Sequence, residues 1–399
     1  MSTTARIRRP RVRTVLRYDG RVSPLELFFD LVFVLAITQC TTLMAANPDW
    51  AGIVRGLFVL TVLWWTWAGY AWLTSVVDPE EGAVRIVIFA AMAAMLVAAL
   101  AVPGSFDDDA LAFACAYAIV RIAHIGLFLL ASRGDPQLRR SVTGLAVSTA
   151  IGVSLLTAAS AADGAVQASL WGVAILLDLG LPFFFWAEGW RLVPAHFAER
   201  HGLILIIALG ESIVAIGVGS KAVVDVTVVV VATLGIAIAA GLWWVYFDVT
   251  VWVAERRLSR LPAGREQNEV ARDAYSYLHL AMVAGIVLLA LGMKKTLEHP
   301  GDPLKVVPAV ALVGGVAAYL LAIVAFRWRL LHTLGRVRPV TAAVLLALVP
   351  IAFEVPAYVT VALVVVVIWA LIVYEVVRYA DFRETVRHEL AREGTGSVG

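Results

Sequence analysis

Long apolar runs recur from one end of the chain to the other, and each is long enough to cross a lipid bilayer. They are separated by short segments rich in glycine, proline and aspartate, such as NPDW and PGSFDDD. Because lipid offers no partner to backbone N–H and C=O groups, runs of roughly 17–25 apolar residues cross it as helices. The composition agrees, since 61% of the 399 residues are hydrophobic and 16% are charged. We therefore predict an all-α polytopic membrane protein.

The apolar runs predict about twelve transmembrane helices. The shortest of the expected spans is the eleventh. An even number of spans places both termini on the same side of the membrane. The expected ranges are 24–46, 52–77, 83–103, 109–132, 139–160, 165–187, 200–219, 226–253, 273–293, 304–326, 339–353 and 355–378.

The placement of arginine predicts on which side of the membrane the two termini lie. Four connecting segments are rich in arginine (133–140, 188–200, 255–266 and 327–338), and all fall on one side if every predicted span crosses. Arginine and lysine are enriched in cytoplasmic loops. We therefore predict a protein of the bacterial cytoplasmic (inner) membrane with both termini in the cytoplasm. The net charge of +2 gives no indication of nucleic-acid binding.

Two similar aromatic motifs indicate an internal repeat. LWWTWAGYAWL begins at Leu63 and LWWVYFDVTVW begins at Leu242, and each follows a span that carries a carboxylate. The alternative is that aromatic belts recur in any polytopic protein. We predict two parallel six-helix repeats, related by an axis along the membrane normal. The expected parts are a basic N-terminal arm (1–23) that lies along anionic headgroups, a first repeat (24–190), a second repeat (191–380) and a polar tail (381–399).

The first span carries two carboxylates in the segment VSPLELFFDLVFVLAITQ (22–39). At helical spacing Glu26 and Asp30 share one face with Phe33 and Ile37. The opposite face carries one large apolar residue followed by three polar ones, namely Leu35, Thr38, Gln39 and Thr42. In the span 200–219 and the residue that follows it, a second stripe of this kind consists of Ser212, Ile216 and Ser220.

Two interpretations of these stripes compete. In the first, the stripes line an ion path, with Leu35 and Ile216 as an apolar constriction and the hydroxyl groups replacing water around an ion. In the second, the small polar residues allow close helix packing and hydrogen-bond across it. The repeat favours the first, because equivalent spans can face each other across the pseudo-axis.

Charged and titratable side chains inside the spans predict a buried charge network. A carboxylate or guanidinium in hydrocarbon needs a partner, a water-filled path or, for the carboxylate, a proton. We favour Asp30–Arg121 or Glu26–Arg85 as structural pairs, because arginine cannot deprotonate. Proton transfer is the alternative, and histidine is the best candidate for it. The network comprises Glu26, Asp30, Arg85, Arg121, His124, Asp178, Glu211, Asp248 and His279.

The chain shows no motif of an enzyme. HExxH, GxSxG and Cys/His clusters are absent, so we predict no catalytic residue, no metal site and no cofactor. The expected partners are membrane lipids and small ions.

The carboxylate and aromatic motifs resemble those of the bacterial low-temperature-requirement protein A (LtrA) family. The resemblance covers almost the whole chain and rests on VSPLELFFDLVFVLAIT (22–38), LWWTWAGYAW and AERHGLILIIALGESIVAIGVG (198–219). It implies a link to growth at low temperature and does not imply a mechanism.

FFDLVFVLAIT is also similar, more distantly, to the first helix of the endosomal and lysosomal potassium channels. That resemblance implies a pore lined by the first and seventh helices, with constrictions at Leu35 and Ile216, and a homodimer of two-repeat chains. The sequence departs from that family at Phe29, where the channels have serine, and at Glu211 with Ser212 in the second repeat. Potassium selectivity therefore does not carry over.

These observations predict a channel-like pathway for a monovalent cation or proton. An ion-coupled transporter of a small solute is the first alternative, with Gly210 and the GVGS run (217–220) as points at which the seventh predicted helix unwinds. A lipid-interacting structural membrane protein is the second.

Overall fold

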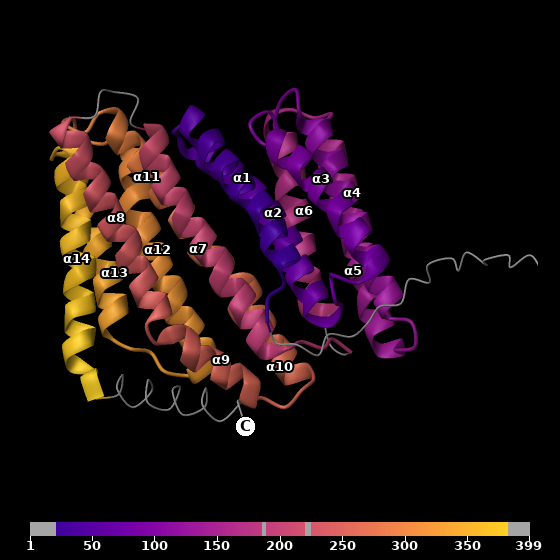
Figure 1. Cartoon of the computed structure of the whole chain (residues 1–399). Coiled ribbons are helices and arrows are strands. Elements are labelled where there is room, and N and C mark those ends of the chain that lie inside the picture. The colour runs from indigo at the N-terminus through magenta and orange to yellow at the C-terminus, as the bar shows by residue number, and fades with distance from the viewer. Residues whose placement is uncertain (1–20, 186–188, 220–224, 382–399) are drawn as a thin grey trace, which may run out of the picture. The chain divides into compact units, whose positions relative to one another are not determined.

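The computed structural model describes residues 21–185, 189–219 and 225–381 (Figure 1). Most of the predicted N-terminal arm (1–23) and polar tail (381–399) lies outside these ranges, as does Ser220. Across the described residues the chain is helical and forms no strand. The all-α class predicted from the sequence is therefore confirmed.

The transmembrane and connecting helices follow one another with short loops. Their bounds are α1 (Pro24–Ala46), α2 (Trp50–Val76), α3 (Gly82–Leu100), α4 (Ala110–Ala131), α5 (Pro136–Ala159), α6 (Gly164–Phe185), α7 (Pro194–Gly219), α8 (Val226–Phe247), α9 (Thr250–Arg260), α10 (Arg265–Ala271), the π-helix η1 (Arg272–Tyr277), α11 (Leu278–Glu298), α12 (Val306–Leu331), α13 (Val337–Leu348), the 3-10 turn η2 (Ile351–Phe353) and α14 (Ala357–Arg378).

Eleven helical segments of the described part are long and apolar enough to cross a membrane. Many large apolar side chains on them point outward, and Ile122 is 70% exposed and Leu176 72% exposed. Such a surface is unusual for a soluble protein and is typical of one that faces lipid. The chain is therefore a multi-pass membrane protein.

The predicted span 339–353 is a shorter helix than expected. The α-helix α13 ends at Leu348, shortly before Pro350, and a single 3-10 turn follows. Proline has no backbone N–H to donate and its ring clashes with the preceding turn, so the helix ends there.

The segment 337–353 nevertheless runs from one end of α12 to the other. The N–H of Ala357 donates to the carbonyl of Asp302, at 2.9 Å, in the loop that precedes α12. Only a short loop joins the opposite end of α12 to Arg338 at the start of α13. The segment therefore returns to the end at which α12 begins, as a membrane crossing requires.

The chain divides into two compact units. The described part of unit 1 comprises 21–36, 61–185, 189–197 and 263–268. In it α3 packs on α4, α4 on α5 and α5 on α6. The aromatic motif of α2 lies in its core, where Trp64, Trp67 and Trp72 are almost completely buried.

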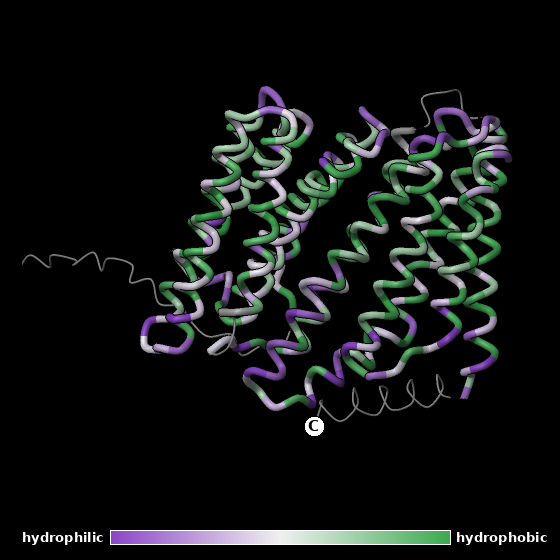
Figure 2. The backbone as a smooth tube through the Cα atoms, turned by 180° about the vertical axis from the view of Figure 1, so that it is seen from behind, coloured by the Kyte–Doolittle hydropathy of each residue, from purple (hydrophilic) through white to green (hydrophobic). Residues whose placement is uncertain are grey.

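The described part of unit 2 comprises 37–60, 198–219, 225–262 and 269–381. The α11–α12 pair is its most extensive helix contact, α13 packs on α12 and α14, and α14 packs on α8. Figure 2 shows these helices as mainly hydrophobic along their length, with hydrophilic residues at their ends. The continuous helix α1 contributes its first residues to unit 1 and its residues from Ile37 onward to unit 2.

Candidate functional site

Within unit 2, α1 meets α7 through a hydroxyl–carboxylate contact. The Thr38 hydroxyl donates to Glu211, whose side chain is 2% exposed. Thr41 lies beside the same carboxylate, and the positive charge of Lys294 on α11 acts on it. We call these four residues the α1–α7 cluster.

The sequence explains why this cluster forms. Thr38 and Thr41 are three residues apart on α1, so both present hydroxyl groups to one neighbouring helix. A carboxylate in a membrane needs donors or a counter-charge. Here the Thr38 hydroxyl donates to Glu211 and Lys294 supplies a positive charge, whereas the Thr41 hydroxyl donates to the carbonyl of Ile37 at 3.3 Å. Lys294 thus lies where a membrane carboxylate gains from a nearby positive charge.

The stripe predicted on α1 is half-buried along its length. Leu35, Thr38, Gln39 and Thr42 are all intermediate in exposure, whereas Phe33 on the opposite face is buried. Thr42 donates to the carbonyl of Thr38 at 2.9 Å, so its hydroxyl is satisfied within its own helix. Thr38 is therefore the stripe residue with a described bond to another helix.

On α7 the predicted stripe residues occupy packed positions. The Ser212 hydroxyl donates to the carbonyl of Leu209 at 2.6 Å. Ile216 is 8% exposed, and its Cδ1 atom lies 2.6 Å from the position that a methyl group on Gly235 would take. Ile216 thus fills the space that Gly235 leaves on α8. Glu211 comes one residue before Ser212 and so lies about 100° away from this stripe. It is the α7 residue that bonds to the α1 stripe.

A second polar cluster lies among α4, α5 and α6 of unit 1. Asp178 accepts from the Tyr117 hydroxyl at 2.9 Å, the Ser148 hydroxyl at 3.1 Å and the Arg121 guanidinium at 3.3 Å. Arg121 is 1% exposed and also donates to Thr149. A buried ion pair of this kind persists because further hydrogen bonds satisfy both charges.

The ion pairs expected from the sequence are therefore wrong in their partners. Arg121 pairs with Asp178 and not with Asp30. Arg85 donates to the carbonyl of Glu80 at 2.6 Å and does not pair with Glu26. Arg121 lies near the middle of α4, whereas Asp30 lies within two turns of the start of α1. A comparison of the depths of these carboxylates in the membrane would have favoured Asp178 as the partner of Arg121.

The two carboxylates of the first span have other partners. Glu26 accepts from the imidazole of His196 at 2.9 Å, and both side chains are buried. His196 in turn lies 3.4 Å from the Ser75 hydroxyl. Asp30 accepts from the indole N–H of Trp67 at 2.8 Å. His196 falls in an arginine-rich loop of the sequence, and no sequence signal singled it out.

The two span histidines lie in different surroundings. His279 of unit 2 is bonded on both ring nitrogens, to the Tyr246 hydroxyl at 2.8 Å and the carbonyl of Ala274 at 3.0 Å. That carbonyl lies in the π-helix η1. His124 of unit 1 packs against Tyr70 and Phe128, with ring centroids 5.3 and 5.0 Å away.

Two members of the predicted charge network are not buried. Arg85 is exposed and Asp248 is half-buried, because both lie at helix ends where the side chain reaches a polar region. Across the described residues, no group of three or more His, Cys, Asp or Glu side chains has the arrangement of a metal site.

The fold and the carboxylates held inside its spans define a polytopic helical membrane protein. The sequence profile of the bacterial low temperature requirement A protein (LtrA) matches residues 21–373. The chain therefore belongs to the LtrA family. It is 27% identical over 307 residues to RA0937, an uncharacterized protein of Rhizobium meliloti strain 1021, covering 74% of each chain. The comparison with solved structures gives no match.

Proposed function

We propose that this LtrA protein forms a channel-like pathway for a monovalent cation or proton along α1 and α7. The observation that carries the proposal is the bond from Thr38 to Glu211. It joins the predicted α1 stripe to a buried carboxylate of α7. Hydroxyl and carboxylate oxygens replace the hydration shell of a cation, and a carboxylate also transfers protons.

Leu35 is the proposed constriction on α1. It lies one helical turn before Thr38, so an ion that passes Leu35 reaches the oxygen atoms of the α1–α7 cluster next. We place the protein in the bacterial cytoplasmic membrane with both termini in the cytoplasm, on the basis of its arginine-rich loops. We also propose that two chains form a homodimer, by analogy with the four-repeat potassium channels.

Flux through liposomes that contain the purified chain tests the pathway. Glu211→Gln keeps the size and hydrogen-bonding capacity of the side chain but removes its charge, so we expect cation or proton flux to fall at least about tenfold. Leu35→Ala widens the constriction and should raise flux by a similar factor. Replacement of potassium by a large organic cation separates the two ions, because only proton flux persists.

Glu354→Gln is the matched control for Glu211→Gln. Glu354 is an exposed carboxylate of unit 2 in the turn before α14, so its loss changes the net charge equally and should leave flux unchanged. Equal flux in wild type, Glu211→Gln and protein-free liposomes would overturn the proposal.

An ion-coupled transporter is the second candidate, and a break in a helix favours it. The helix α8 ends at Phe247 and α9 begins at Thr250, and the π-helix η1 interrupts the span that continues as α11. Broken helices recur at transporter sites, and π-helical turns recur at functional sites in general. The break expected at Gly210 is wrong, because α7 is continuous from Pro194 to Gly219. Saturable solute counterflow would identify a transporter, whereas a channel gives none.

A further inference from the structure

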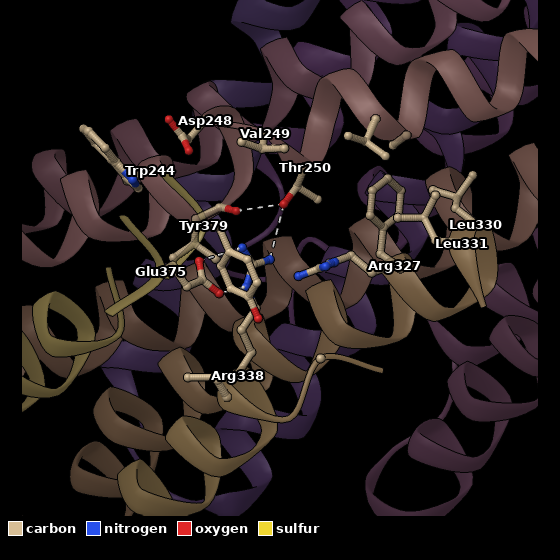
Figure 3. Close-up of a pocket in the computed structure, with 16 residues that line it drawn as sticks. Trp244, Asp248, Val249, Thr250, Arg327, Leu330, Leu331, Arg338, Glu375 and Tyr379 are labelled. Carbon is tan, nitrogen blue, oxygen red and sulfur yellow. Dashed lines mark hydrogen bonds and ion pairs between the residues drawn. The ribbon is translucent and has the colours of Figure 1, made fainter. Parts of the chain in front are cut away.

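A cavity of about 390 Å³ lies within unit 2 where several helices end together. The ends of α8, α12 and α14 and the starts of α9 and α13 surround it (Figure 3). Its volume falls in the range of small-molecule sites. Its walls are mainly apolar and include Val245, Val249, Val253, Phe326, Leu330 and Leu331.

One ion pair in the cavity is already complete. Arg338 donates from Nε and Nη2 to the two carboxylate oxygens of Glu375, at 2.8 and 3.0 Å. Arg338 also donates to the Thr250 hydroxyl at 3.3 Å. Such a two-point pair fixes both side chains and cancels their charges.

Arg327 in the same cavity has no such partner in the part of the chain that the structure describes. It is half-buried, and across residues 21–185, 189–219 and 225–381 it makes no hydrogen bond or ion pair. The nearby carboxylate Glu375 is engaged by Arg338, and Asp248 lies beside Trp244, whereas Arg327 lies on the side of Leu330 (Figure 3). Because a guanidinium group stays charged, it gains from an anion that the cavity admits.

Aromatic side chains near Arg327 indicate that it lies at the level of the membrane interface. Next to the cavity Trp328 is 52% exposed, and Tyr379 in its wall is 46% exposed. Exposed tryptophan and tyrosine near helix ends mark the headgroup level of a bilayer. A cavity that combines an arginine with apolar walls at the headgroup level suits a lipid. Pockets with a basic residue between membrane helices hold anionic headgroups.

We infer that this cavity binds one anionic phospholipid. Its phosphate lies at Arg327, and the part of an acyl chain next to the headgroup lies against Val253, Phe326 and Leu330. The Arg338–Glu375 pair then serves as a fixed polar wall. The site is distinct from the α1–α7 cluster and does not depend on the ion pathway.

Native mass spectrometry of the full chain in detergent tests the inference, with added phosphatidylglycerol, phosphatidylcholine, glycerol 3-phosphate or inorganic phosphate. We expect one phosphatidylglycerol to bind more tightly than phosphatidylcholine. Arg327→Gln should weaken its apparent affinity about fivefold or more. Val253→Trp keeps the charge but fills the apolar part, and should weaken it as well.

Arg336→Gln is the matched control, because Arg336 lies exposed in the same arginine-rich segment and does not line the cavity. It removes the same charge and should leave the affinity within about twofold. Equal weakening by Arg327→Gln and Arg336→Gln would show general attraction to basic loops and would overturn the site. Displacement of the lipid by phosphate or glycerol 3-phosphate, with no effect of Val253→Trp, would also overturn it, because a soluble anion then fits better.

Discussion

At the scale of single residues, four carboxylates in the spans have different sets of partners. Asp178 is held by a guanidinium and two hydroxyl groups, Glu26 by a histidine and Asp30 by an indole N–H. Glu211 is held by a hydroxyl, with a lysine in electrostatic range. Because Asp178 carries a complete set of strong partners, we assign it to structure, whereas the α1–α7 cluster around Glu211 is the proposed pathway.

Asp178→Asn is predicted to destabilise the protein strongly. The substitution leaves Arg121 buried without a counter-charge, and loss of one partner of a buried pair costs about 3–5 kcal/mol. Chemical unfolding in mild detergent, followed by circular dichroism, measures the change.

Tyr117→Phe is the control for this prediction. It removes one hydrogen bond to Asp178 and leaves the ion pair intact, so the expected loss is about 1 kcal/mol or less. If Asp178→Asn were no more destabilising than Tyr117→Phe, Arg121 would not depend on this carboxylate.

At the scale of helices, small residues bring α11 and α12 together. A methyl group on Gly285 would lie 2.6 Å from the carbonyl oxygen of Gly315, and one on Gly315 would lie 2.6 Å from that of Gly285. The two backbones are therefore in direct contact. Close approach of this kind increases van der Waals contact between membrane helices, which water does not drive together.

Gly285→Ala is predicted to force these helices apart. The added methyl group meets backbone atoms that cannot rotate away, so we expect a loss of roughly 1–3 kcal/mol in the free energy of unfolding. Gly314→Ala on the same helix pair is the control, since its methyl group would meet only a Val310 side-chain atom at 3.7 Å. Equal stability of the two variants would show that the contact tolerates a side chain.

At the scale of the whole molecule, the number of crossings depends on the segment 337–353. Its helix α13 has 12 residues, which corresponds to about 18 Å and is less than the hydrocarbon core of a bilayer. The bond from Ala357 to Asp302 nevertheless places the end of this segment beside the loop before α12. We therefore count it as a crossing.

Cysteine labelling tests this topology in cells. In a chain with Cys40 and Cys115 replaced by alanine, a membrane-impermeant maleimide should label Asp107→Cys on intact cells. Ser259→Cys and Tyr379→Cys should react only after the membrane is permeabilised. Labelling of Tyr379→Cys on intact cells would show that the segment 337–353 does not cross.

The sequence by itself determined the helices of this LtrA protein, and tertiary structure decided which polar groups meet. Each span follows from its own run of apolar residues, because the transfer of side chains and backbone into lipid is a local property. The shortening of α13 was also accessible from Pro350, which the prediction of that span did not use. The partner of a buried charge depends instead on the depth and rotation of two separate helices. Asp178 with Arg121, Glu26 with His196 and Glu211 with Thr38 therefore emerged only when the helices were packed.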